Sequence, residues 1–117
     1  MAYDGTESSV YAIRQFTGLF PEICHLKTTL VYAGNEKNGI PDRDLIEELA
    51  SCHFKNLSVS KIFEENSKKF SNWLKDQFNP LLVSGSFSRP GISELFNKSF
   101  VINIIKEHTT PVFIAHH

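Results

Sequence analysis

Hydrophobic positions along the chain switch between two periodicities, which predicts helices and strands in alternation. In four segments apolar residues recur at steps of three and four, as on one face of a helix. Short β-rich runs lie between these segments. The predicted helices begin near Thr6 or Ser8, at Asp42 or Asp44, at Asn66 or Ser67 and at Ile92, and the predicted strands cover residues 26–32, 57–63, 80–84 and 112–115.

This alternation predicts one α/β domain over residues 1–117, a flavodoxin- or Rossmann-like sandwich with a parallel sheet and helices on both faces. Residues 57–63 alternate Leu, Val and Lys with Ser, which indicates one less buried face. Residues 1–4 supply only the tail of a first strand, because a central parallel strand usually needs about five residues. We therefore expect a trimmed chain or one half of a tandem protein. Phe70, Trp73 and Phe78 are expected to be packing residues on the third helix.

Composition and charge argue against several classes of function. The 117 residues are 41% hydrophobic, which is enough to bury one core. Twelve basic residues nearly balance 13 acidic ones, so we expect no basic face for nucleic acid or a membrane surface. No apolar stretch approaches the roughly 20 residues that span a bilayer, and MAYDGTESS does not resemble a signal peptide. A cytoplasmic domain is expected.

Two Cys-His pairs, Cys24-His25 and Cys52-His53, are the obvious candidates for a metal site. Adjacent residues rarely converge on one metal, and the two- to four-residue spacing typical of zinc ligands is absent. We therefore expect no metal, and thiols that are buried or half-buried.

Two segments resemble the universal stress protein (UspA-like) domain. AYDGTESSVYAI, residues 2–13, is similar to the family's first strand, which ends in Asp before a small residue, a Ser/Glu pair and a helix. LLVSGSFSRPGISELFNKSFVINIIKEHTTPVFIA, residues 81–115, is similar to its last strand, loop, helix and strand. The order of elements between them agrees. The resemblance implies a five-stranded parallel sheet in the order 3-2-1-4-5, here with a truncated first strand.

That order implies a ligand crevice where the winding of the sheet reverses, between the ends of the first and fourth strands. Asp4 and Gly85 stand at these ends. Nucleotide-binding members carry glycine, two residues, glycine, nine residues, then glycine and Ser or Thr, whose backbone N–H groups embrace the triphosphate. The positions that this resemblance assigns to nucleotide binding are Asp4, Tyr32 (beside the adenine), Gly85, Ser88, Gly91, Lys98 and Ser99.

Two of the three motif glycines are replaced, by Ser88 and Lys98. If a replaced glycine needed a left-handed conformation, its side chain costs roughly 1–2 kcal/mol. Pro90 also removes one N–H donor. Lys98 could fill the cradle, swing out or bring a cation to the phosphates. We interpret the loop as a partly eroded nucleotide site, with no certain cofactor and ATP as the ligand it would take.

Each candidate also has a purely structural interpretation. Asp4 could cap the first helix, Gly85 and Gly91 could permit tight turns, and Tyr32 could fill the core. Ser99 could be a helical hydroxyl or a cap. The sequence contains no nucleophile elbow and no Gly-Lys-Ser/Thr triplet, so nothing in it demands an enzyme.

We therefore predict a non-catalytic stress-response binding and signalling module. The family commonly dimerises through its last strand, and residues 112–115 form an apolar edge that would aggregate if left unpaired, so a homodimer is expected. One alternative is a nucleotide sensor that binds ATP between Asp4 and Gly85. Another is a small enzyme related to adenine-nucleotide hydrolases, whose serine- and glycine-rich loop is faintly echoed at residues 4–9. A phosphoacceptor receiver is disfavoured because residues 57–63 end without an Asp.

Overall fold

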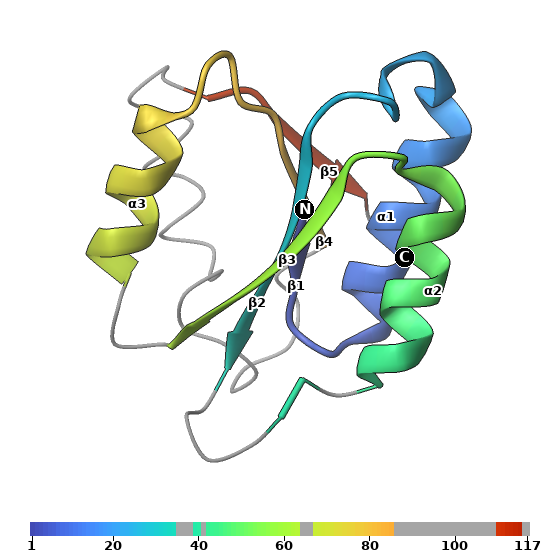
Figure 1. Ribbon diagram of the computed structural model, residues 1–117, viewed down its shortest axis with the longest axis horizontal. Helices are drawn as coiled ribbons and strands as arrows, with labels where there is room; N and C mark the ends of the chain where they lie inside the picture. Colours follow the sequence, from blue (N-terminus) through green and yellow to red (C-terminus); the bar gives the residue numbers. More distant parts are fainter. Residues whose placement is uncertain (35–38, 41, 64–66, 86–109, 116–117) are drawn as a thin grey trace.

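The computed structural model describes residues 1–34, 39–40, 42–63, 67–85 and 110–115, and within them the chain folds as mixed α/β. Within the described residues, five strands form two hydrogen-bonded groups, and the strands in each group are parallel (Figure 1). Three strands pair in the order β1-β2-β3, and two pair as β4-β5. Their bounds are β1 Ala2–Tyr3, β2 Thr28–Gly34, β3 Leu57–Phe63, β4 Leu82–Gly85 and β5 Val112–Ala115.

Helices lie on both sides of these strands. The helices are α1 (Glu7–Leu19), α2 (Arg43–His53) and α3 (Ser67–Asp76), and a short 3-10 turn, η1 (Pro21–Ile23), follows α1. Figure 1 shows α1 and α2 together on one side of the strands and α3 on the other. The predicted helix that begins at Ile92 lies outside the described residues.

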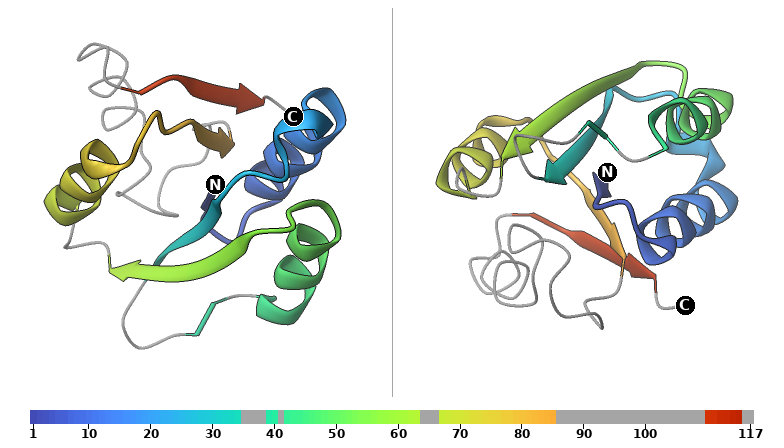
Figure 2. Two further views of the ribbon diagram at one scale, coloured as in Figure 1. Left: turned by 45° about the horizontal axis from the view of Figure 1, so that its top comes forward. Right: turned by 90° about the horizontal axis from the view of Figure 1, so that it is seen from below.

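The expected five-stranded sheet is present only in part. β1 contacts β4 as well as β2, and β4 and β5 run side by side past it (Figure 2). Within the described part of the chain, however, no hydrogen-bonded ladder joins β1 to β4, so the strands form a group of three and a group of two. β1 spans two residues, as expected of a short first strand.

The amino terminus is built into the sheet. The Met1 amino group donates to the carbonyl oxygen of Thr29 at 2.7 Å, and Val31 N–H donates to the Met1 carbonyl at 2.8 Å. Burial of the amino group lowers its pKa to about 5, because the charged form loses its hydration. Pairing with β2 therefore begins one residue before β1.

The core lies between the strands and the helices α1 and α2. Phe16 of α1 is its centre, with ring centroids 6.4 Å from Phe54 and 5.4 Å from Phe113. Burying a side chain of this size stabilises the fold by roughly 1.5–3 kcal/mol. The core cluster of buried residues comprises Tyr3, Ala12, Ile13, Phe16, Cys24, Leu30, Tyr32, Ile46, Ala50, Phe54, Val83 and Ala115.

The expected packing role of the aromatic residues near α3 is wrong for Phe78. This side chain is 93% exposed, and Trp73 is 38% exposed. The reason is that α3 ends at Asp76, before Phe78, and Asn79 then takes a left-handed conformation with a φ of 44°. Leu74 is buried on α3, and the side chain of Phe70 lies outside the described part.

Candidate functional site

The turn from β1 into α1 is organised around Asp4. Its Oδ1 accepts hydrogen bonds from Thr6 N–H at 3.0 Å and from Thr6 Oγ1 at 2.5 Å. Gly5, between them, has a φ of 84°, a conformation that costs other residues roughly 1–2 kcal/mol. The Asp-Gly pair is thus explained by the turn that it makes.

Thr6, not Asp4, caps α1. The Thr6 hydroxyl oxygen accepts from Ser9 N–H at 3.3 Å, and Ser9 Oγ donates back to the Thr6 carbonyl at 2.8 Å. Of the two predicted start residues, Thr6 is therefore correct. The interpretation of Asp4 as the cap itself is wrong, because its carboxylate holds the capping residue in place.

Gly85, at the end of β4, packs directly on the backbone of α1. A Cβ atom at this position would lie 2.6 Å from the carbonyl carbon of Ser8, 2.7 Å from its oxygen and 2.8 Å from Ser9 N. Its φ is not positive, so a tight turn does not explain the glycine. Close approach between β4 and the first turn of α1 does. The structure thereby brings Asp4 and Gly85 to the same helical turn.

Tyr32 belongs to the core and lies opposite Tyr3 on the neighbouring strand. The centroids of their rings are 5.9 Å apart, and Lys61 Nζ stands 5.9 Å from the Tyr32 ring centroid. Burial, followed by the nearby charge of Asp42, raises the pKa of Tyr3. The core interpretation of Tyr32 is confirmed, and its place beside an adenine stays a prediction.

The remaining motif positions, Ser88, Gly91, Lys98 and Ser99, lie outside the described residues. Of the expected positions the structure therefore describes Asp4, Tyr32 and Gly85, and a ligand crevice beside Asp4 and Gly85 stays a prediction. Gly5 and Thr6 also shape this turn, but the sequence analysis did not include them among the site residues. The Asp4-Gly5 dipeptide, which is typical of turns, could have indicated Gly5.

The two cysteines differ in their surroundings. Cys24 is buried, and burial, followed by the charge of Glu22, raises the pKa of its thiol. Cys52 is exposed, so the expectation of a buried or half-buried thiol is wrong there. In the ranges that the structure describes, no three His, Cys, Asp or Glu side chains gather closely enough to hold a metal ion.

Comparison with protein-family models, curated proteins and solved structures finds no match to this chain. The resemblance to the universal stress protein domain thus rests on the sequence motifs. In the described part of the chain, no helix combines the length and apolar character needed to cross a membrane.

Proposed function

We propose that the chain is a UspA-like binding and signalling module with an eroded nucleotide site, and that it does not act as a catalyst. The observation that carries this proposal is the meeting of Asp4 and Gly85 at the first turn of α1. In an open parallel α/β sheet, ligands bind at the carboxyl ends of the strands where the winding reverses. The contact between β1 and β4 supports the order 3-2-1-4-5 for the complete sheet, with that crevice at its centre.

The two sides of the proposed crevice suit different parts of a nucleotide. The first turn of α1 offers backbone N–H groups and a positive helix end, both of which favour an anion, and the Glu7 carboxylate on the same turn opposes it. The Asp4 carboxylate would repel phosphate at short range. It retains capacity to accept hydrogen bonds beyond the two from Thr6, so it suits a hydroxyl or amino group of a nucleoside. The phosphates would then lie toward the loop that follows Gly85.

A nucleotide sensor is the second candidate, and one titration series separates the two. Calorimetry with Mg-ATP should show weak binding to the wild-type chain, after the denatured protein has been checked for co-purified nucleotide. Restoring both motif glycines, in Ser88→Gly/Lys98→Gly, should tighten binding at least tenfold, since each replaced glycine costs roughly 1–2 kcal/mol. Circular dichroism checks that this variant folds.

Asp4→Asn tests the other side of the crevice. Asparagine keeps an oxygen for Thr6 and removes the charge, and Asp44→Asn makes the same change on the exposed surface of α2. Micromolar binding by the wild type that weakens in Asp4→Asn alone would make the module a nucleotide sensor. No binding at millimolar Mg-ATP by either the folded wild type or the glycine-restored variant would overturn the eroded-site proposal.

A further inference from the structure

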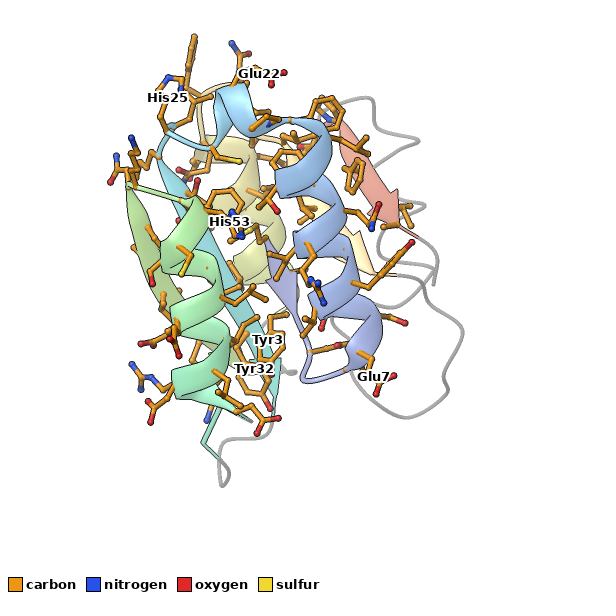
Figure 3. The ribbon with its side chains drawn as sticks, turned by 90° about the vertical axis from the view of Figure 1, so that its right-hand side faces the viewer. Tyr3, Glu7, Glu22, His25, Tyr32 and His53 are labelled. Carbon is orange, nitrogen blue, oxygen red and sulfur yellow. The ribbon has the colours of Figure 1, made fainter. Side chains whose placement is uncertain are left out.

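A cavity of about 430 Å³, open to solvent on one side, lies between the N-terminal halves of helices α1 and α2. In their C-terminal halves the helices close on each other through the stacked rings of Phe16 and Phe54, which directly follows α2. Toward their N-terminal ends they part, and Tyr3 lies between them (Figure 3). This α1–α2 cavity has the size of typical small-molecule sites, which run from roughly 300 to 1,000 Å³.

The walls of the cavity combine an apolar middle with aromatic rings. Val10 from α1 and Ile46 and Leu49 from α2 line its sides. Tyr3, only 1% exposed, lies at its floor, and Leu45 at its edge is 66% exposed. From the sequence, such a stripe at helical spacing on each helix predicts a core face. Ile46 is buried in the core as this predicts, and Val10 and Leu49 pack partly against the core, but the cavity remains beside all three.

The charges on the cavity are unevenly distributed. α1 and α2 follow neighbouring parallel strands, so their N-terminal ends lie at the same end of the cavity, where Glu7 and Asp42 line it. Arg14 lines it seven residues farther along α1, roughly 10 Å away at 1.5 Å per residue. Two helix N-termini contribute about half a positive charge each. The two full carboxylate charges outweigh them, so this end favours a cation.

The side chain of Asp42 does not cap α2, although its backbone carbonyl accepts a hydrogen bond from Ile46 N–H. Asp42 occupies the N-cap position of α2 in a left-handed conformation, with φ 49° and ψ 37°, and its side chain makes no capping hydrogen bond. The pKa of Tyr3 is raised by burial first and by the negative charge of Asp42 second. The second cause agrees with a negative charge close to Tyr3 in the cavity. The Asp42 carboxylate lines the cavity and is not used as the cap of α2.

We propose that the α1–α2 cavity binds an organic amine, with its cationic head at Glu7 and Asp42 and its apolar body against the facing helix stripes. The cavity shares Gly5 and Thr6 with the turn beside the proposed nucleotide crevice, whereas Asp4, Tyr32 and Gly85 do not line it. Asp4→Asn and Asp42→Asn therefore distinguish the two sites, because each alters a residue of one site only.

Three probes that share one ring and differ in charge test the proposal: phenethylamine, 2-phenylethanol and phenylacetate. Each is titrated into the folded chain and followed by two-dimensional amide NMR. Phenethylamine should bind most tightly and shift the amides of Gly5, Glu7, Val10 and Leu45. Asp42→Asn should weaken it roughly threefold, as expected for an exposed charge pair, and asparagine also tolerates the left-handed conformation.

Asp44→Asn is the matched control, because it removes the same charge from the same helix outside the cavity. It should leave phenethylamine binding unchanged. The proposal is overturned if phenylacetate binds as tightly as phenethylamine, or if the two aspartate variants weaken binding equally. It is also overturned if millimolar phenethylamine shifts none of the cavity amides.

Discussion

Replacing Gly85 with alanine tests the packing that forms the candidate crevice. The added Cβ would lie 2.6–2.8 Å from three backbone atoms of Ser8 and Ser9. Backbone atoms within a helix cannot rotate aside as the end of a side chain can, so the first turn of α1 must move away from β4. Overpacking of this kind costs roughly 1–3 kcal/mol, and we expect Gly85→Ala to fall near the upper end.

Urea unfolding followed by circular dichroism measures this loss. At an m-value of roughly 1–3 kcal/mol per M, a loss of about 3 kcal/mol lowers the midpoint by roughly 1 M or more. Gly18→Ala is the matched control, because nothing lies within 4 Å of a Cβ at that position and Gly18 is helical. Alanine is the better helix former, so this control should gain up to about 1 kcal/mol.

If the free energy of unfolding of Gly85→Ala lies within about 0.5 kcal/mol of the wild-type value, the predicted clash with the α1 backbone is refuted. The end of β4 would then not rest on the α1 backbone, and Gly85 would need another explanation. If the loss is as expected, Gly85→Ala cannot be used to test nucleotide binding, because its effect on the fold would lower affinity by itself. Asp4→Asn is the better probe of the crevice for this reason.

Two further predictions concern the ends of the described chain. For a polypeptide with a free Met1 amino group, the free energy of unfolding should rise by about 1 kcal/mol per pH unit between pH 6 and 8. The reason is that the unfolded amine still binds a proton over most of this range, whereas the folded amine, with a pKa of about 5, does not. Urea unfolding at several pH values measures this rise; an N-acetylated chain should lack it, and an equal pH dependence in both chains would contradict the prediction. In sedimentation velocity the wild type should be a dimer, and Ile114→Lys, on the apolar strand β5, should be a monomer. Leu19→Lys, which changes an exposed residue of α1, is the control and should stay dimeric. A wild type that is monomeric at tens of micromolar would contradict a dimer through β5.

The strands were the most predictable part of the fold. The expected runs 57–63 and 112–115 coincide with β3 and β5, because β-rich sequence with clear boundaries leaves little choice of element. β2 begins at Thr28, two residues later than expected, because Leu26 is still held by the turn of η1 through a hydrogen bond to Ile23. Thr28 N–H is the first to pair across, with the carbonyl of Asn56. The type of each element could be predicted from local sequence, whereas the first residue of β2 depended on a hydrogen bond to a residue distant in the sequence, Asn56.

The candidate site was less predictable, since its residues are explained by contacts that no local pattern contains. The resemblance implied that Asp4 and Gly85 stand at the ends of neighbouring strands, and in the structure the two strands, β1 and β4, contact each other without a hydrogen-bonded ladder in the described residues. The sequence could not show that Gly85 is required by the approach of β4 to α1, because the two segments are more than 70 residues apart in the sequence. The α1–α2 cavity could not be predicted either. Helical periodicity shows which face of a helix points inward, but not how closely the faces of two helices pack.

The structural reasons for Asp4, Gly5 and Gly85 bear directly on the resemblance. The Asp4 carboxylate supports the α1 cap, Gly5 supplies a positive φ and Gly85 admits the helix backbone. All three residues would be needed to join a first strand, its helix and a fourth strand whether or not a nucleotide ever bound. Their presence therefore supports the proposed fold more strongly than it supports a ligand. The discriminating residues are those that this packing does not require, so the affinity gained on restoring glycine at Ser88 and Lys98 carries more weight than any affinity lost on altering Gly85.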